Sequence, residues 1–419
     1  MTKFASSSTI TTQAAHNQAR DEFVQKFGPD LGHYLPVERI RSSLYSARSS
    51  TIPIIPHTYP QIPHIDEFPE QYRHMKDNPD EQFLFVNSVF LNDQRILAFT
   101  TRHDLQILAS SEQLYMDGTF KVTPEPFQQV FTMNTMMGPT EDRSVLIPRI
   151  YFLLPGKSEP VYSEMFDLTL RCIEVIHEQF NEGDGLAHWQ RISCDFESGL
   201  VAAVRNAEFD PQHQIVLEGC HYHFCAAVYK KLVEAGAFSM YNDYHDPNSN
   251  AFKQFVQKLF ALHFLPADRV AACFQQLILQ DAPAHLRNTA RFAHFIDYFA
   301  NQWVFHEVNR NMVNLHNRMG RRRTNNNIEG WHNKVRQELH EHPNLWVFIE
   351  RLQKLHHEAR QLENDILADP LTAIRLRQPA QRRKEERLME LQNMYAPGGG
   401  QFGSDVNYVR RVAHDMNVF

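Results

Sequence analysis

The chain has 419 residues, of which 42% are hydrophobic and 22% are charged, and it contains five cysteines. This length and composition favour a globular soluble protein of two or three domains in a reducing compartment, and they exclude a wholly disordered chain or a disulfide framework. The formal net charge of −7 excludes the strongly basic balance of a dedicated nucleic-acid-binding protein. No apolar run approaches the roughly 18 residues of a membrane-spanning helix, and the N-terminus lacks the apolar core of a secretory signal.

The first hundred residues predict one strand pair and little other regular structure. A short helix is expected near Leu35–Ala47. The prolines between Pro53 and Pro69 predict an extended linker, because proline fixes φ and removes a backbone donor. After it, Gln82–Leu91 and Arg95–Thr100 have the composition of strands and predict a hairpin.

The central block carries the clearest pattern. Runs of β-branched and aromatic residues bounded by Pro, Gly and Asp predict strands, and apolar residues at a spacing of three and four predict helices. The expected order is strands Leu114–Lys121, Phe127–Met137 and Val145–Leu154, helix Pro160–Phe180, strand Arg191–Phe196, helix Ser198–Ala207 and strand Gln214–Cys220. Three strands that read as an antiparallel meander, followed by alternating β and α elements, are typical of a ribonuclease-H-like mixed α/β sheet.

The remainder of the chain reads as helical. Helical periodicity from His221 to about Gly320 predicts a long all-helical insertion between the fifth strand and the helix that carries Glu329, and further helices are expected at Asn325–Leu339, Leu345–Asp365 and Pro379–Met394. The predicted divisions are a partly disordered N-terminal segment (1–58), a small region packing on the core (59–110), the catalytic domain (111–223 and 321–345), the insertion (224–320) and the C-terminal helices and tail (346–419).

Three acidic residues stand where such a fold would use them. Asp117 lies inside an apolar strand, where a charge costs several kcal/mol unless it is paired, solvated or bound to metal. Asp195 ends the fourth strand, and Glu329 lies near the start of a helix behind an Asn-rich turn. Taken singly, each has a structural alternative as a strand end, a helix opener or a first-turn acid. Glu197, two residues after Asp195, is either an assisting acid or a solvated acid at a helix start.

Four ordered blocks of sequence resemble the catalytic core of Mutator-like element (MULE) transposases. The resemblance covers about residues 40–360. It rests on Met116–Lys121 with Pro126–Gln129, on Cys194–Glu197, on the Cys-x-x-His signature in Gly219–His223, and on Arg323–Asn333 with His342–Trp346; Ser43–Arg48 also resembles text upstream of this domain in animal members.

The resemblance implies a nuclear DDE transposase, active on transposon ends and target DNA as a homo-oligomer. Asp117, Asp195 and Glu329 would bind Mg²⁺ (or Mn²⁺) for in-line phosphoryl transfer. One departure is that no cysteine precedes Cys172, whereas relatives often carry an N-terminal zinc finger. The alternative reading is a domesticated, transposase-derived DNA-binding or regulatory protein without catalysis.

Cys220 and His223 have half of the spacing of a zinc site. A closed structural zinc site takes four ligands, and His306 and His316 are the candidate partners within the helical region. The alternative is that Cys220 and His223 are packed core residues.

Basic residues around the third acid are candidates for DNA contacts. A basic strip immediately precedes the Asn-rich turn, and arginine there would contact phosphates without reading bases; its alternatives are a nuclear-import signal or solvated surface. The predicted DNA-binding residues are Arg318, Arg321, Arg322, Arg323, Lys121 and His332.

Overall fold

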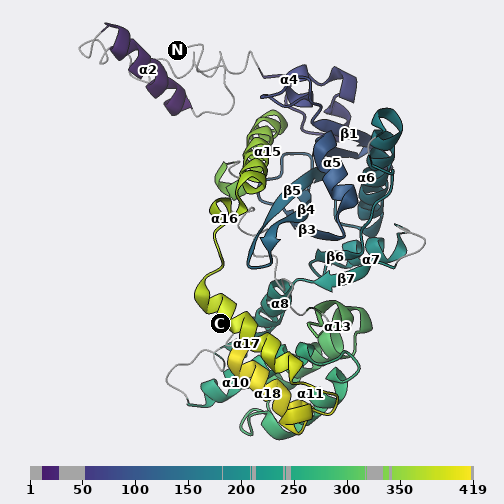
Figure 1. Ribbon diagram of the computed structural model, residues 1–419, viewed down its shortest axis with the longest axis vertical. Coiled ribbons are helices and arrows are strands. Elements are labelled where there is room, and N and C mark those ends of the chain that lie inside the picture. The colour runs from purple at the N-terminus through teal and green to yellow at the C-terminus, as the bar shows by residue number, and fades with distance from the viewer. Residues whose placement is uncertain are drawn as a thin grey trace.

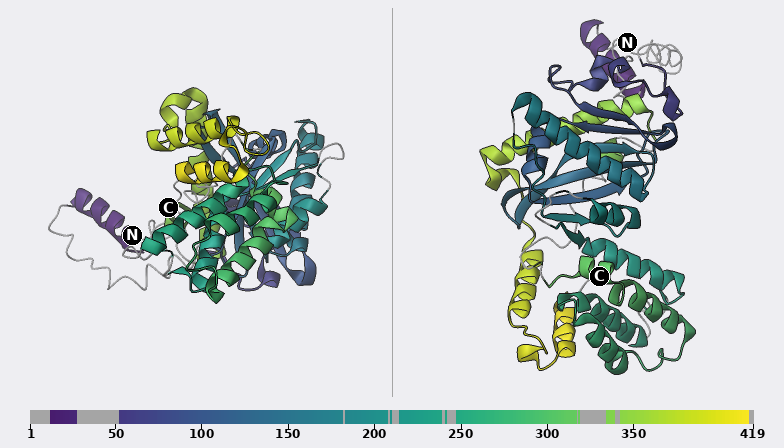
Figure 2. Two further views of the ribbon diagram at one scale, coloured as in Figure 1. Left: turned by 90° about the horizontal axis from the view of Figure 1, so that it is seen from below. Right: turned by 90° about the vertical axis from the view of Figure 1, so that its right-hand side faces the viewer.

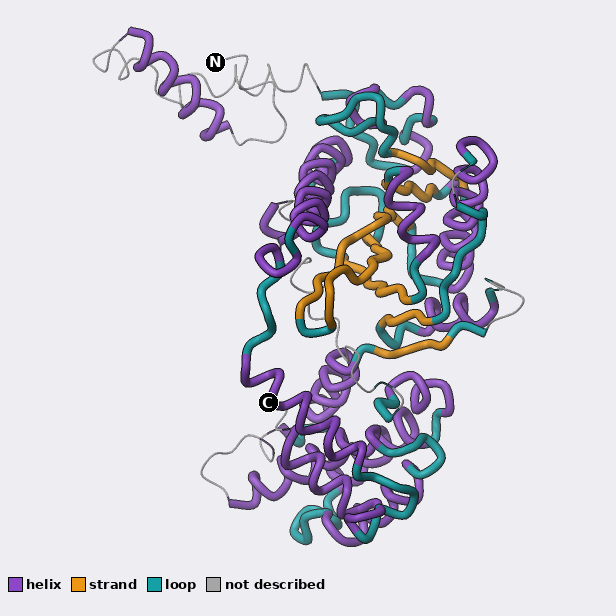
Figure 3. The backbone as a smooth tube through the Cα atoms, viewed as in Figure 1, coloured by secondary structure: helices purple, strands orange, loops and turns teal. Residues whose placement is uncertain are grey.

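The computed structural model describes residues 12–27, 52–181, 183–207, 209, 214–238, 241, 247–316, 318, 334–338 and 342–416. Apart from the N-terminal helix α2 (Thr12–Phe27), these residues form two parts, one built on a sheet and one made of helices (Figure 1). Figure 3 shows the strands confined to the first part.

The sheet part contains seven strands and the helices that cover them. The strands are β1 (Leu84–Val89), β2 (Arg95–Thr100), β3 (Gln113–Thr119), β4 (Gln129–Thr140), β5 (Arg143–Leu154), β6 (Arg191–Cys194) and β7 (Val216–Gly219). The helices are α4 (Glu70–Arg73), α5 (Arg102–Ser110), α6 (Glu159–Phe180), α7 (Ser198–Asn206), α15 (Leu345–Ala368) and α16 (Pro370–Ala373).

The sheet is mixed, with the order β1-β2-β5-β4-β3-β6-β7. Neighbours from β1 to β3 pair antiparallel, whereas β3 pairs parallel with β6 and β6 with β7. Antiparallel neighbours such as β4 and β5 are joined by a tight turn, while parallel neighbours need a crossover. The crossover from β5 to β6 contains α6, and the one from β6 to β7 contains α7.

Both faces of the sheet are buried. Along β2, Ile96 and Ala98 join the core beneath α5, α6 and α7, while Leu97 and Phe99 join the core beneath α15. This alternation follows from the two-residue period of a strand. The right-hand view of Figure 2 shows α6 on one side of the sheet and α15 on the other.

The second part consists of helices around one apolar core. Its helices are α8 (His221–Glu234), α10 (Pro247–Ala261), α11 (Val270–Asp281), α12 (Ala290–Phe299), α13 (Glu307–Val313), α17 (Pro379–Asn393) and α18 (Asp405–Met416). Aromatic residues of α10 and α12 fill the core, and Leu388 of α17 and Val409 of α18 complete it. Ion pairs from Arg410 to Asp281 and from Arg269 to Asp405 fix α18 against α11.

The prediction of a mixed α/β fold is confirmed. All five strands expected in the central block are present, with ends that differ by a few residues. The predicted hairpin also forms, but β2 pairs with β5, so the same sheet continues through it. The described residues between β7 and Val313 contain helices and no strand. The domain boundaries stay predictions.

Several elements differ from expectation, among them the N-terminal helix α2, which lies in a segment expected to be partly disordered. The proline-rich stretch is not a free linker, because it makes two 3-10 turns (Tyr59–Gln61 and Ile65–Glu67) and buries Ile62 and Phe68 in the core beneath α15. The helices α5 and α18 were not predicted. The helix expected near Leu35–Ala47 lies outside the described residues.

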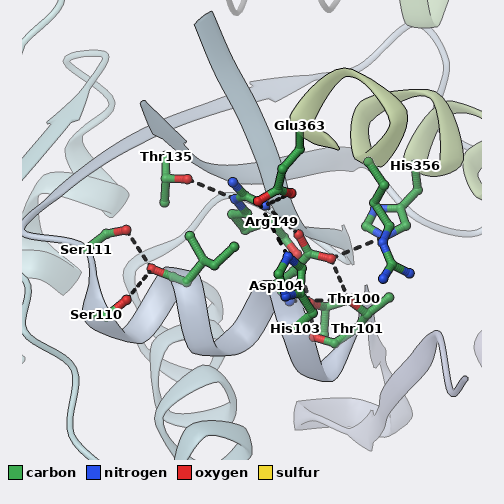
Figure 4. A network of polar contacts seen from close by, with 12 residues as sticks. Thr100, Thr101, His103, Asp104, Ser110, Ser111, Thr135, Arg149, His356 and Glu363 are labelled. Atoms are coloured by element: carbon green, nitrogen blue, oxygen red, sulfur yellow. Dashed lines mark hydrogen bonds and ion pairs between the residues drawn. The ribbon is translucent and has the colours of Figure 1, made fainter. Parts of the chain in front are cut away.

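A buried ionic cluster ties α15 to the sheet (Figure 4). The Arg149 guanidinium on β5 lies 2.9 Å from Asp104 on α5 and 2.6 Å from Glu363 on α15, and all three side chains are buried. Asp104 also accepts a 2.5 Å hydrogen bond from Thr101 and lies 3.2 Å from Nε2 of His356. Burial alone would raise the pKa of Asp104, but the hydrogen bond from His356 and the charges of His356 and Arg149 hold it well below its usual range.

We predict that Asp104→Asn destabilises the sheet part by about 3–5 kcal/mol, because it removes one partner of a buried charge. Urea unfolding at neutral pH measures this loss. Since the pKa of Asp104 is lower in the folded chain than in the unfolded chain, its stabilisation is present above about pH 4 and is lost below it. The variant should therefore lose less stability than the wild type on acidification.

Asp142→Asn is the matched control for this prediction. Asp142 lies 3.8 Å from Arg377 in a partly exposed ion pair, so its replacement should change stability by less than about 1 kcal/mol. Equal losses of unfolding free energy in the two variants would show that the buried cluster stabilises the fold no more than an exposed ion pair does.

Candidate functional site

Two of the predicted acids belong to neighbouring parallel strands: Asp117 lies on β3, and Asp195 directly follows β6. The register pairs Tyr115 of β3 with Ser193 of β6, and Asp117 and Asp195 each follow two residues later. Parallel neighbours lie about 4.8 Å apart, and residues two apart along a strand share a face. Both carboxylates therefore stand at the carboxyl ends of adjacent strands, where ligands of open α/β sheets gather.

Both acids lie close enough to the buried thiol of Cys194 to influence its pKa. Asp117 is 7% exposed, and its Oδ1 accepts a 2.8 Å hydrogen bond from the amide of Gly118. Asp195 is half-buried, and its Oδ1 accepts from the amide of Glu197 at 3.1 Å. Burial raises the pKa of the Cys194 thiol well above its usual value, and the charges of Asp195 and Asp117 raise it further. Both carboxylates thus act on the same buried atom.

Glu197 is a third carboxylate at this edge. Its Oε1 accepts a 2.9 Å hydrogen bond from the hydroxyl of Tyr162 on α6, and that hydroxyl in turn accepts from Gln129 of β4 at 3.0 Å. Burial raises the pKa of Glu197, the Tyr162 hydrogen bond lowers it and the charge of Asp195 raises it, with a net upward shift. The sequence allowed two interpretations of Glu197, an assisting acid or a solvated acid at a helix start. Its hydrogen bond to Tyr162 favours the first.

A lysine missed in the sequence lies beside these acids. The charge of Lys157 lowers the pKa of Glu197, and its Nζ lies 5.7 Å from the ring centroid of Phe120. The loop that carries Lys157 is held in place because Gln129 donates a 2.7 Å hydrogen bond to the carbonyl of Gly156. Lys157 belongs to no motif, so only the spatial arrangement could reveal it.

The third predicted acid, Glu329, lies outside the described residues, as do Arg321, Arg322, Arg323 and His332. The chain after them returns to the same edge. Residues 334–338 are helical, Val335 is buried in the core beneath α15, and the amide of His342 donates a 3.2 Å hydrogen bond to the carbonyl of Lys121. Lys121 is exposed and follows Asp117 by four residues. The described residues that follow the third acid are therefore anchored beside the end of β3.

Arg318 does not fit its predicted role. Its side chain is only 4% exposed, and its guanidinium donates to the carbonyl of Gly219 at 2.9 Å and to that of Met312. It also lies 3.9 Å from Glu218 on β7. These contacts tie the chain after α13 to the edge of the sheet. Because a buried guanidinium cannot reach a DNA phosphate, we remove Arg318 from the predicted DNA contacts.

The cysteine and histidine pair stays a prediction. Cys220 is buried at the start of α8 and His223 is half-buried one turn later. No group of three or more His, Cys, Asp or Glu that could hold a metal is found within the part of the chain that the structure describes. His306 accepts a hydrogen bond from the amide of Asn309, and Nδ1 of His316 lies 3.1 Å from the carbonyl of Phe264. Both candidate partners thus have other contacts.

Comparisons with family models, with curated proteins and with solved structures find no match for this chain. Within its described residues, no helix is long and apolar enough to cross a membrane. The interpretation of the site therefore depends on its own geometry.

We predict that Glu197→Gln stabilises the protein at neutral pH in the absence of divalent cations. Glutamine keeps the acceptor for Tyr162 and removes the repulsion with Asp195. Since the pKa of Glu197 is higher in the folded chain than in the unfolded chain, the free energy of unfolding falls as the pH rises through this range. The melting temperature of the variant should exceed that of the wild type by more at pH 7 than at about pH 4.

Calorimetry in EDTA at the two pH values gives this comparison. The same difference at both values would show that the substitution acts through packing and that Glu197 carries no electrostatic cost.

Proposed function

We propose that this protein is a MULE-type DDE transposase, which cleaves transposon ends and joins them to target DNA by metal-dependent in-line phosphoryl transfer. Asp117, Asp195 and Glu329 would hold Mg²⁺ or Mn²⁺. The observation that carries the proposal is that Asp117 on β3 and Asp195 directly after β6 each follow the paired residues Tyr115 and Ser193 of these parallel strands by two positions.

The strand arrangement supports a ribonuclease-H-like core. A central strand, β3, has an antiparallel meander on one side and two parallel strands on the other. This is the arrangement expected from the order of strands and helices in the sequence. In this interpretation β1 and β2 extend the sheet, and the helical part is the insertion that shapes the DNA channel and a contact between copies.

The donor set at the site fits a hard cation. The thiol closest to the acids, Cys194, is kept protonated by its raised pKa and offers no thiolate. Carboxylate oxygens are what Mg²⁺ prefers, and it leans on substrate phosphates for its remaining ligands. When bound, the metal would supply activation of a water or a DNA 3′-hydroxyl and stabilisation of the leaving oxygen.

The protein's own groups would position the reactants. The hydroxyl of Tyr162 holds the carboxylate of Glu197, two residues after Asp195. The acids Asp117, Asp195 and Glu197 form what we call the acidic edge of the sheet. Lys157 gives this edge a cation that can pair with a phosphate of the bound strand. Burial of Asp117 excludes competing solvent from one side of the site.

We predict that Asp117→Asn and Asp195→Asn each reduce Mg²⁺-dependent cleavage to background while leaving DNA binding nearly intact. Losing a metal ligand disables the chemistry more than the docking. The measurement uses purified protein and duplexes that carry the inverted repeats flanking its gene, with Mg²⁺ or Mn²⁺. Glu329→Ala should behave in the same way.

Asp184→Asn is the matched control, because Asp184 is an exposed acid paired with His188 away from the site. It should cleave like the wild type. A wild-type protein that binds these duplexes but cuts none of them would instead support the alternative of a DNA-binding regulator, and cleavage by Asp117→Asn would exclude the metal triad.

We also predict different behaviour of the arginines around position 320. Replacing Arg321, Arg322 and Arg323 together with Ala should weaken binding to any DNA sequence. It should also reduce the slope of log K against log salt concentration by up to about 0.9 per lost phosphate contact. Arg318→Ala should lower thermal stability and leave the slope unchanged, because its guanidinium is occupied inside the protein. Titrations at several salt concentrations separate the two effects. An unchanged slope in the triple variant would make this strip a surface or nuclear-import feature.

A further inference from the structure

An exposed aromatic ring stands beside the acids with a cation over it. Phe120 follows Asp117 by three residues and is 48% exposed, although its neighbours Thr119 and Val122 are buried. Nζ of Lys157 lies 5.7 Å from its ring centroid, within the range of a cation–π contact. We infer that Phe120 and Lys157 dock an unpaired nucleotide of the DNA next to the bond that is cleaved. This inference rests on the proposed function, which supplies DNA as the ligand and the position of the cleaved bond.

The backbone beneath the ring is fixed. The amide of Thr123 donates a 3.2 Å hydrogen bond to the carbonyl of Phe120, and the hydroxyl of Thr123 donates to the carbonyl of Thr119 at 3.2 Å. The next residue, Lys121, accepts from His342. A half-exposed ring on a turn held by three hydrogen bonds is preorganised to receive a flat partner.

Lys157 connects the ring to the acids. Its charge acts on Glu197 while its ammonium group lies near the ring of Phe120. Its backbone packs closely against the start of α7, since a Cβ added to Gly199 would lie 2.4 Å from the carbonyl oxygen of Lys157. A phosphate paired with this ammonium group would place the attached nucleotide at the ring.

The ligand that suits this pair is an unpaired nucleotide. Aromatic side chains stack on bases of single strands, and positive charge beside them follows the phosphates. In an intact duplex the face of a base is covered by its neighbours, so the ring could stack only on a base that is unpaired or flipped out. The inferred substrate is therefore DNA that is opened next to the scissile phosphate.

The chain contains a matched control of the same chemistry. Phe180, at the end of α6, is 50% exposed and has the guanidinium of Arg102 at 4.5 Å from its ring centroid. It is separated from Tyr162, which contacts the acidic edge, by eighteen helical residues or about 27 Å. If an exposed ring with a cation were enough to bind DNA, Phe180 would do so as well.

The test measures binding of a 12-nucleotide single strand and of the same sequence as a duplex, by fluorescence anisotropy in EDTA. Phe120→Ala should weaken single-strand binding by about 5- to 150-fold, the range of one stacked base, and change duplex binding by less than twofold. Phe120→Trp should retain single-strand binding, and its extra fluorescence over the wild type should be quenched by the oligonucleotide. Lys157→Ala should weaken single-strand binding and reduce the slope of log K against log salt concentration by about 0.7, the value for one lost phosphate contact.

Three outcomes would overturn the inference. They are unchanged single-strand binding by Phe120→Ala, an equal loss for single strand and duplex, and a loss of the same size in Phe180→Ala. Thermal melting of each variant checks that the fold is retained, which a half-exposed position should allow.

The binding assay requires no catalysis, so the inference and the proposed function fail separately. Phe120-dependent binding by a protein that never cleaves would keep the inferred nucleotide site and remove the transposase assignment. Cleavage that depends on Asp117 but is unaffected by Phe120→Ala would keep the transposase assignment and remove the inferred nucleotide site.

Discussion

The parallel pairing of β3 with β6 is the contact on which the rest of the sheet part depends. It is the point where the sheet changes from antiparallel to parallel, so the chain must cross over from the end of β5 to the start of β6. The 22-residue helix α6 makes this crossover, and its Tyr162 reaches the acidic edge because of it. A slip of one residue in this register would send Asp117 and Asp195 to opposite faces.

The acidic edge and the ionic cluster balance each other within one sheet. At the carboxyl ends of β3 and β6, the charge of Lys157 only partly offsets the burial of Glu197 and its repulsion with Asp195, so the pKa of Glu197 stays raised. On β5, Arg149 instead gathers two buried carboxylates around one guanidinium and holds α15 on the sheet. Because α15 also anchors Val335, this cluster supports the segment that leads back to Lys121. The favourable ion pairs around Arg149 thus offset the charge repulsion between the acids at the ends of β3 and β6.

The central strands could be predicted because their signal is local. Runs such as Val145–Leu154 are rich in apolar and β-branched residues and end at clear turn residues. The pairing of β2 with β5 could not be predicted, since it joins segments about fifty residues apart. The local sequence of neither strand indicates its partner. The helix α18 was missed although Val406, Val409 and Val412 recur at helical spacing, because its charged residues obscure a short apolar stripe.

The site shows the same division. Asp117 and Asp195 could be named because a charge beside apolar strand residues is conspicuous. Arg318 looked like one of four equivalent surface arginines, and only its position shows that its guanidinium satisfies buried carbonyls. Lys157 and Tyr162 were not predicted as site residues, because a lysine in a loop and a tyrosine in an amphipathic helix carry no local sign of what they will contact. Long-range contacts decide those roles.

The place of α18 in the helical core has a consequence for synthesis on the ribosome. Val406, Val409 and Val412 come long after α10 and α12 in the chain, yet they share one apolar core with the aromatic residues of those helices. Domains generally fold as units in the order in which they emerge. The sheet can acquire all its strands, and α15 its partners, before α18 has been synthesised, but the helical core stays open until α18 has left the ribosome. A nascent chain therefore carries an aromatic surface uncovered over this interval, and a stop codon shortly before Asp405 would leave that surface uncovered permanently.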